Sequence, residues 1–522
     1  MRVSVRKLSQ PAILLTMLNV VVFSLLLLPW LNPFAPGPSP AVVPLLFSWT
    51  CAAALMGLRI WRVEVMAPGR LAAVVAGAWL LAGLVSSGMG LLQYFDAAAR
   101  WAPWVNATAA GEAFSNLRQR NQFATLTNMA LVALLWWAWW FPRGGLLKTI
   151  LVCLASVLLV LGNGASSSRT GLLQLALVLG LALWWGGWRQ PVVRALLVVS
   201  TVGYVVAVWG LPWLAGFDAG SHGMLARLRD DASGAVACSS RRLLWSNVLD
   251  LIVQKPWLGW GWGELDFAHY NNLYGSPRFC EIMDNAHNLP LHLAVELGVP
   301  VALLACGALT VWALRQRPWQ EVDSTRQLAW GVLAVVGLHS LLEYPLWYGP
   351  FQMAVLACVL LLRRSPEVIS EVKIRSSSPL AQVFIASVAT VLIAFLSFAA
   401  WDYRRVSQIY LSAQERDPAM REHTLDKISD TLLFRNQYLF AELGLVALTP
   451  SNAQWTYDTA AELLHYSPEP RVIEKIIESA TMLGREDEAV LHLARYHAAF
   501  PADCAIWLRG HRENTAQAPD PK

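Results

Sequence analysis

The residues best suited to chemistry lie in segment 284–298, which reads D-N-A-H-N-L-P-L-H-L-A-V-E-L-G. A polar group of Asp284, Asn285, His287 and Asn288 ends abruptly where an apolar helix is expected to begin. Polar side chains gathered at a membrane boundary are costly unless they are used. We therefore expect a functional site here, with His287 as its central residue.

The expected helix carries two more ionisable residues, His292 and Glu296, one turn apart. His292 would be buried in an apolar span, so a structural role is the better interpretation for it. His339 and Glu343 are also four residues apart and share a helix face. We interpret His339 as part of a strut inside the helix bundle, whereas Glu343 and the adjacent Tyr344 lie nearer the surface and can reach a ligand.

Five arginines depart from the charge pattern of the rest of the chain and are expected on its outward side. The alternative role for each of them alone is contact with lipid headgroups or capping of a helix end. Together with a central histidine they are typical of a site that holds a diphosphate, because arginine combines a fixed charge with forked donors. The five are Arg118, Arg120, Arg169, Arg241 and Arg242.

The composition indicates an integral membrane protein. The 522 residues are 56% hydrophobic and only 14% charged, and mean hydropathy is +0.43, whereas soluble domains carry about 25% charged residues. The 26 tryptophans suit the interfacial belts of a protein with many spans. The first apolar run ends at Trp30 without a small-residue cleavage site, so we expect a retained span rather than a signal peptide.

Apolar runs of bilayer-spanning length predict about eleven transmembrane helices. They lie near residues 11–30, 41–59, 71–93, 122–141, 146–162, 171–187, 193–213, 289–314, 327–343, 347–362 and 380–402. Lysine and arginine gather on the side of the N-terminus, which the positive-inside rule makes cytoplasmic. The residues that set this orientation are Arg59, Arg62, Arg70, Arg143, Lys148, Arg189, Arg194, Arg315, Arg317, Arg363, Arg364, Lys373 and Arg375.

The fold expected is therefore all-α. It has a polytopic inner-membrane bundle over residues 1–403 and a periplasmic helical C-terminal domain over 404–522. A long periplasmic loop covers about 215–288 and contains an amphipathic stretch, 241–251, that we expect to lie along the membrane interface. The glycine-rich run 258–263 after it is a weak signal. In the tail, helices expected at 460–464, 472–483 and 487–499 resemble a degenerate tetratricopeptide-like repeat.

The seven cysteines show no metal-site spacing. Cys51, Cys153, Cys306 and Cys358 lie in apolar runs and are small packing residues. Cys238 and Cys280 share the long loop and can pair if that loop lies in an oxidising compartment, which would leave Cys504 unpaired.

Several motifs together resemble the O-antigen ligase and polymerase superfamily. They are N-A-H-N…E-L-G around His287, S-R at Ser168 and Arg169, and R-x-x-x-W…P-x-x-G-x-G from Arg241 to Gly261. R-Q-R-N-Q-F-A at 118–124 and H-S-L-L-E-Y-P-L-W-Y at 339–348 look like the branch of pilin-type protein O-oligosaccharyltransferases. The tail is similar to the C-terminal domain often found in that branch.

The resemblance implies transfer of a glycan from an undecaprenyl-diphosphate carrier to a hydroxyl of a periplasmic protein such as pilin. It implies no metal and no cofactor, and we expect no nucleic-acid partner. His287 matches the family histidine and would take the hydroxyl proton. Arg169 and Arg241, with Arg242 as the neighbour that can replace it, would hold the diphosphate. The residues expected to orient the substrates are Gln119, Arg120, Asn121, Asn288, Glu343 and Tyr344.

Other functions stay open at this point. An O-antigen ligase that transfers to lipid A–core would use the same chemistry, and a polysaccharide polymerase would need room for two lipid-linked chains. A transporter would place its ionisable groups at the bilayer midplane, whereas those here gather mostly at the outer face. An inert membrane anchor for the tail would not need the outward arginines. The glycan, the acceptor and the oligomeric state are not indicated by the sequence.

Overall fold

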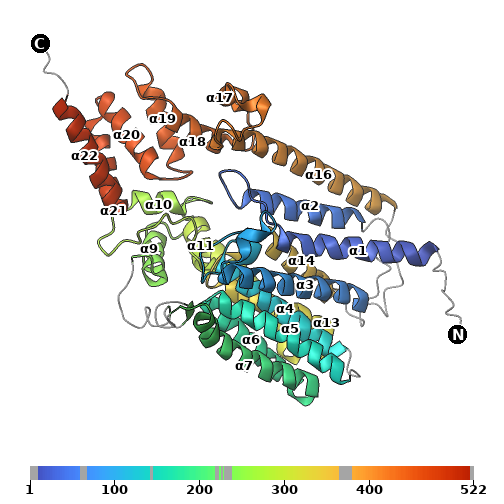
Figure 1. The fold of residues 1–522 in the computed structure, drawn as a ribbon. Helices are drawn as coiled ribbons and strands as arrows, with labels where there is room; N and C mark the ends of the chain where they lie inside the picture. The colour runs from blue at the N-terminus through green and yellow to red at the C-terminus, as the bar shows by residue number, and fades with distance from the viewer. Residues whose placement is uncertain are drawn as a thin grey trace, which may run out of the picture. The chain divides into compact units, whose positions relative to one another are not determined.

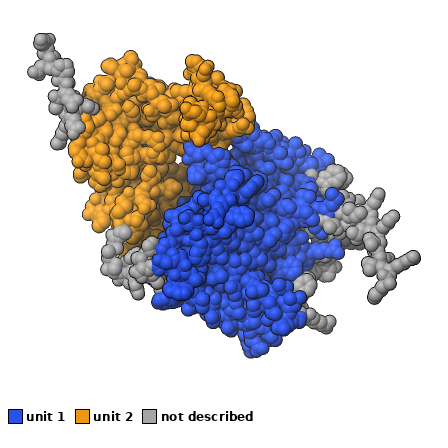
Figure 2. Space-filling view, in the orientation of Figure 1, with its two compact units in different colours: residues 1–234, 313–400 blue, residues 235–312, 401–522 orange. Residues whose placement is uncertain are grey.

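In a computed structural model of the chain, the residues described are 10–58, 68–140, 145–217, 223–224, 227, 238–363 and 379–517. Every regular element in those ranges is a helix (Figure 1). Some of the basic residues used to predict the orientation lie outside the described ranges, namely Arg59, Arg62, Arg143, Arg364, Lys373 and Arg375. The structure divides into two compact units, residues 1–234 with 313–400 and residues 235–312 with 401–522 (Figure 2).

The first unit is a bundle of apolar helices. In it, α3 packs against α1, α4 and α5, α5 packs against α7, and α13 packs against α4 and α14. The long apolar runs form helices because a helix satisfies all of its backbone hydrogen bonds internally. The helices are α1 (Gln10–Leu31), α2 (Val42–Leu58), α3 (Pro68–Tyr94), α4 (Arg120–Trp140), α5 (Leu146–Ala165), α6 (Arg169–Trp184), α7 (Pro191–Leu214), α13 (Ser324–Ser340), α14 (Gly349–Arg363) and α16 (Pro379–Ser407), of which α16 continues into the second unit.

Each predicted span falls on a helix, with one difference. The range 289–314 is two helices, α11 (Leu289–Leu297) and α12 (Val299–Gln316), separated at Gly298, whose φ is +88°. The candidate span begins at Val299. His292 and Glu296 therefore precede it, and the expectation that His292 lies inside a span is wrong, although its burial is confirmed.

Five helices among the described residues are long and apolar enough to cross a membrane. They cover Gly69–Tyr94, Leu146–Ala165, Pro191–Leu214, Val299–Gln320 and Leu380–Tyr410. Four shorter apolar helices cover Met17–Leu31, Val42–Leu58, Arg169–Trp184 and Gly349–Arg363. These observations support a membrane helix bundle, and the number of eleven crossings stays a prediction.

The second unit joins the long loop to the tail. The loop contributes α9 (Arg241–Gln254) and α10 (Leu265–Asn271), which pack against each other, and α9 also packs against α11. The apolar face of α9 is buried in the loop's own core with Leu265, Met283 and Val295. The expectation that this face lies along the membrane interface is therefore not met. The division into domains at residue 403 stays a prediction.

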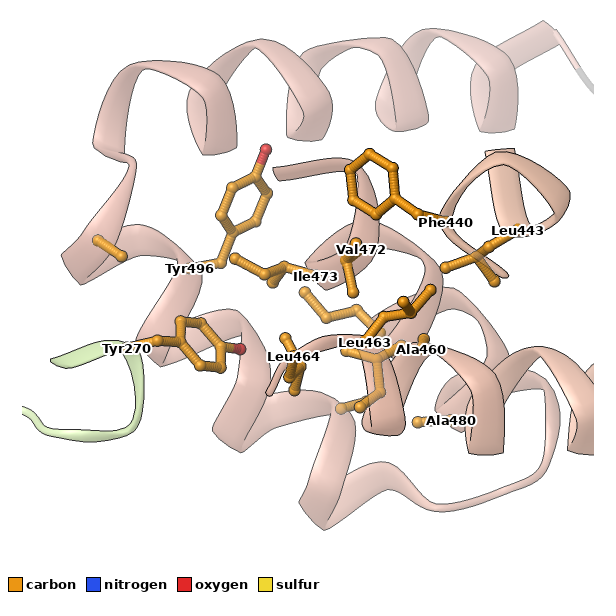
Figure 3. Close-up of a cluster of buried hydrophobic side chains, with 14 of the residues drawn as sticks. Tyr270, Phe440, Leu443, Ala460, Leu463, Leu464, Val472, Ile473, Ala480 and Tyr496 are labelled. Atoms are coloured by element: carbon orange, nitrogen blue, oxygen red, sulfur yellow. The ribbon is translucent and has the colours of Figure 1, made fainter. Parts of the chain in front are cut away.

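The tail consists of short helices that pack in sequence order, α18 on α19, α19 on α20, α20 on α21 and α21 on α22. They are α18 (Arg435–Leu445), α19 (Ala453–Leu463), α20 (Pro470–Met482), α21 (Glu486–Ala499) and α22 (Pro501–Gln517). Their apolar faces form one buried cluster, and Tyr270 of α10 lies in it beside Leu464 (Figure 3). The tyrosine hydroxyl bonds Nδ1 of His492 at 2.8 Å, so the loop is anchored to the tail.

Candidate functional site

In the first unit, the start of α6 is fixed by Ser168. Its hydroxyl accepts a hydrogen bond from the backbone N–H of Gly171 at 2.9 Å, which caps the helix. The same hydroxyl donates to Oδ1 of Asn121 at 2.6 Å. Arg169 is the first residue of α6 and is half-buried. The position of Arg169 is therefore set by a capped helix end that is tied to α4.

Asn121 joins this helix end to the turn after α13. Its Nδ2 donates to Oε1 of Glu343 at 2.8 Å, and the Glu343 side chain is buried. Hence the structure brings together Asn121, Glu343 and the start of α6. The expectation that Glu343 lies nearer the surface is wrong, because this residue is 5% exposed. The prediction did not include Ser168, although a serine directly before a helix is a recognisable cap signal.

A second polar layer lies deeper in the same bundle. The hydroxyl of Thr125 lies 2.9 Å from Nδ1 of His339 and also bonds the side chain of Gln174. Gln174 donates in turn to the backbone carbonyl of Val335 at 3.0 Å. All three side chains are buried. The interpretation of His339 as an internal strut is confirmed, while Thr125 and Gln174 were not predicted because isolated polar residues in apolar runs give no positional signal.

The remaining predicted residues of this unit have local roles. Oε1 of Gln119 accepts from the N–H of Gln122 at 2.6 Å, and Arg120 makes a partly exposed contact of 3.5 Å with Glu112. Tyr344 is half-buried and stacks on Tyr348, with ring centroids 5.8 Å apart.

Arg118 does not behave as part of an anion site. Its guanidinium donates to the backbone carbonyls of Pro33 and of Asn116, the latter at 3.3 Å. The residue also has a left-handed φ of +59°. Because these carbonyls are neutral acceptors that hold the loop before α4, Arg118 has a structural role, and its expected place in the arginine cluster is not supported.

In the second unit, His287 directly precedes α11 in a strained backbone conformation, with φ of +51°. Non-glycine residues rarely adopt this region, and it persists only where the surroundings hold it. The N–H of His287 donates to Oδ1 of Asn285 at 2.9 Å, and Nε1 of Trp245 donates to the carbonyl of Ala286 at 3.0 Å. Asn288 caps α11 by accepting from Leu291 N–H at 3.1 Å.

The two adjacent arginines of α9 differ. Arg241 is half-buried, whereas Arg242 is exposed. Arg241 and Arg242 are four and three residues before Trp245, so both lie near the side of α9 that contacts Ala286 beside His287. Helix spacing does not separate them, and the lower exposure of Arg241 favours it as the candidate.

The start of α9 is also linked to the segment before His287. Cys238 and Cys280 form a disulfide with their Cα atoms 5.4 Å apart, and the N–H of Cys280 donates to the carbonyl of Cys238 at 3.3 Å. The pairing left open from the sequence is thus present, and Cys504 is free. Asn247 adds a further tie, because its Oδ1 accepts from Phe279 N–H at 2.8 Å and its Nδ2 donates to the Pro277 carbonyl at 3.1 Å.

The carboxyl group of Asp266, in α10, is held away from water. Burial raises the pKa of Asp266 to about 7, and the negative charges of Glu264 and Asp284 add to this effect. Asp284 is exposed at the surface; partial desolvation raises its pKa, and the neighbouring His287 opposes that shift. Within the described part of the chain, no three side chains of His, Cys, Asp or Glu are grouped as metal ligands.

Three protein-family models match parts of this chain. Residues 154–306 match the O-antigen ligase family and include the arginine and histidine candidates Arg169, Arg241 and His287. Residues 113–138 match the protein glycosylation ligase family and include Gln119 and Asn121. Residues 327–514 match a family described as the C-terminal part of virulence factor membrane-bound polymerases.

Two curated relatives come from Acinetobacter baylyi. A general O-oligosaccharyltransferase is 27% identical over 259 residues, which is 46% of this chain and 42% of the relative. A ComP-specific O-oligosaccharyltransferase is 25% identical over 248 residues, 47% of this chain and 43% of the relative. The chain thus matches less than half the length of each of these relatives. No solved structure matches it.

These matches confirm the resemblance to the O-antigen ligase and polymerase superfamily. Within that superfamily, the protein glycosylation ligase match and both relatives support the pilin-type O-oligosaccharyltransferase branch. They also support an enzyme of the glycosyltransferase type.

Proposed function

We propose that this protein transfers a glycan from an undecaprenyl-diphosphate-linked donor to a hydroxyl group of a periplasmic protein, pilin-like in kind. The observation that carries the proposal is the protein glycosylation ligase match at 113–138, in agreement with both O-oligosaccharyltransferase relatives. The protein would work in the bacterial inner membrane with its active site toward the periplasm. The disulfide between Cys238 and Cys280 supports an oxidising compartment for the long loop.

In the proposed reaction, the acceptor hydroxyl oxygen attacks the anomeric carbon of the donor glycan. A new glycosidic bond forms, and the bond from the anomeric carbon to the diphosphate oxygen breaks with its electron pair leaving on the diphosphate. His287 accepts the hydroxyl proton, which makes the oxygen a better nucleophile. The strained, hydrogen-bonded backbone at His287 supports this role, because strained residues cluster at active sites.

Arg169 and Arg241 stabilise the charge that develops on the leaving diphosphate. Both are half-buried, and a guanidinium that is partly removed from water interacts more strongly with a phosphate than an exposed one. Arg242 is exposed and has the lesser role. Tyr344, Arg120 and Gln119 orient substrate from the first unit.

Asn121, Glu343 and Asn288 act by positioning. Asn121 donates to Glu343 and accepts from Ser168, and this pair of bonds holds the helix end that carries Arg169. Asn288 caps the helix that follows His287. These contacts refine the expectation that the three residues orient substrate directly.

Two other acceptors give alternative functions. The match of residues 327–514 to membrane-bound polymerases favours extension of a lipid-linked glycan as the second candidate. Transfer to lipid A–core is the third, because residues 154–306 match O-antigen ligases.

One assay separates these functions. The purified chain would receive an undecaprenyl-diphosphate oligosaccharide with pilin, with lipid A–core or with neither acceptor, each in the presence and absence of chelator. Glycosylated pilin that forms equally with chelator is the expected result. Product on lipid A–core alone would make the protein an O-antigen ligase, and longer lipid-linked glycan without either acceptor would make it a polymerase.

A further inference from the structure

A chain of buried polar side chains runs from the backbone of His287 into α11. Oδ1 of Asn285 accepts the His287 N–H at 2.9 Å. Nδ2 of the same amide lies 3.5 Å from Nε2 of His292, and this Nε2 lies 3.4 Å from Oε2 of Glu296. Asn285, His292 and Glu296 are 4%, 2% and 1% exposed, so water does not compete for these contacts.

The Glu296 end of this series of polar side chains is covered by the glycine-rich turn, residues 258–263. Trp260 N–H donates to the carbonyl of Val295 at 2.9 Å, and Gly261 N–H donates to that of Glu296 at 3.0 Å. A Cβ on Gly259 would lie 2.3 Å from the Glu296 carbonyl oxygen, and its φ is +69°. Only glycine allows the turn to approach the end of α11 this closely, and the turn thereby seals Glu296 from solvent.

The hydrogen-bond donors constrain where the protons lie. Oδ1 of Asn285 is used by His287, so the amide turns its Nδ2 toward His292, and an amide nitrogen can only donate. Nε2 of His292 must then accept, and it can do so only without a proton. The Glu296 oxygen that faces the same Nε2 must in that case carry the hydrogen and donate it.

The electrostatic surroundings favour this arrangement. Burial raises the pKa of Glu296 to about 7. The backbone N–H groups of Gly263 and Leu265 oppose this shift but are outweighed by the burial. Burial lowers the pKa of His292 to about 4, and the positive charge of His287 acts in the same direction. Both groups are therefore neutral between about pH 4 and pH 7. The other charged side chains on the elements around α11 include Glu264 in the turn, Asp266 in α10, Asp284 in the segment before α11, and Arg241, Arg242, Asp250 and Lys255 in and directly after α9.

We propose that Glu296 and His292 form a buried positioning pair that holds Asn285, and through it the strained backbone of His287, in the conformation used for glycan transfer. The inference rests on the proposed function of His287. Ionisation of Glu296 removes the hydrogen that faces His292. The neutral His292 then adopts the tautomer that carries its proton on Nε2 instead of Nδ1, this N–H faces the carboxylate, and Asn285 loses its acceptor.

The test compares Glu296→Ala with Glu296→Gln in the full chain. Gln resembles the neutral carboxylic acid, so Glu296→Gln should keep kcat near the wild-type value between about pH 4 and pH 7. It should also remove the loss of activity that we expect of wild type as pH rises through about 7. Ala should lower kcat by about 100-fold with little change in KM for the donor, because small displacements of a catalytic group cost about that much. The matched control is Glu486→Gln, an exposed residue at the start of α21.

The outcomes separate a positioning role from folding and from the proposed function. A melting temperature lowered in Glu296→Ala, with kcat per folded molecule and the pH profile both unchanged, would overturn the inference. So would a Glu296→Gln variant that keeps the loss above pH 7. His287→Ala serves as the reference: if it transfers glycan normally, the proposed function fails instead, whatever Glu296 does.

Discussion

Asn121 and Glu343 lie 222 residues apart in sequence and meet through a hydrogen bond of 2.8 Å from Nδ2 to Oε1. The other side of the Asn121 amide accepts from Ser168 at 2.6 Å. One asparagine therefore joins α4, the cap of α6 and the turn after α13. The half-buried Arg169 follows directly on this junction, which gives a rigid base for the phosphate contact that we propose for it.

Glu343→Ala should destabilise this junction. The substitution leaves Nδ2 of Asn121 partly buried without its acceptor, which costs about 1–3 kcal/mol. Glu343→Gln keeps an oxygen acceptor and should melt close to wild type. Thermal unfolding of the purified chain in detergent measures both, and equal melting temperatures for wild type and Glu343→Ala would contradict the role of this bond.

Arg241→Ala should weaken use of the donor more than Arg242→Ala. Arg241 is half-buried, whereas Arg242 is exposed. Loss of one charge-assisted contact corresponds to about 1.5–3 kcal/mol, or roughly a 10- to 100-fold rise in KM for the donor. Initial rates at varied donor concentration test this. Arg242→Ala is the matched control, and a larger effect there would reverse the assignment.

Asp266→Asn should stabilise the protein at alkaline pH. The folded carboxyl stays protonated up to about pH 7, whereas the unfolded one ionises near its model value of 3.8. The folded state therefore loses stability as pH rises through this window, and the loss is complete above pH 7. The free energy of unfolding lost in this way is at most about 4 kcal/mol, at about 1.4 kcal/mol per pKa unit.

Melting temperatures of wild type and Asp266→Asn, measured below and above this window, check the sign. The variant should gain stability relative to wild type on the alkaline side. An Asp266→Asn difference that is the same at both pH values would show that the carboxyl is not held neutral.

Reduction of the Cys238–Cys280 disulfide should destabilise the loop that carries Arg241 and His287. The bridge closes 42 residues of sequence, and such bridges typically contribute about 2–4 kcal/mol. Reductant should lower the melting temperature of wild type but not that of Cys238→Ser. Cys306→Ser is the control that should keep the response, and a wild type indifferent to reductant would contradict the pairing.

Much of the fold could be predicted because apolar runs of fixed length and their flanking charges are local signals. All predicted spans fall on helices. The break at Gly298 was missed because residues on both sides of it are apolar. Position 298 requires glycine because a Cβ there would lie 2.1 Å from the carbonyl oxygen of Trp257. This contact depends on a turn about forty residues earlier in the chain, so the local sequence does not reveal it.

The candidate site was predictable in part for the same reason. The motifs indicated Asn121, Glu343 and His287, but not that Asn121 and Glu343 bond each other. Thr125 and Gln174 were missed because their polarity matters only once α4, α6 and α13 are packed together. The preference for Arg241 over Arg242 also needed the structure, because only the folded chain shows that Arg241 is half-buried and Arg242 exposed.

The most direct test of the central claim compares the initial rate of glycan transfer to pilin by wild type and by His287→Ala. The donor is an undecaprenyl-diphosphate oligosaccharide, and melting temperature is measured on the same samples. The account predicts a loss of about 100- to 10,000-fold, the usual contribution of a general base, with folding unchanged. Transfer by a folded His287→Ala variant at the wild-type rate would contradict the account.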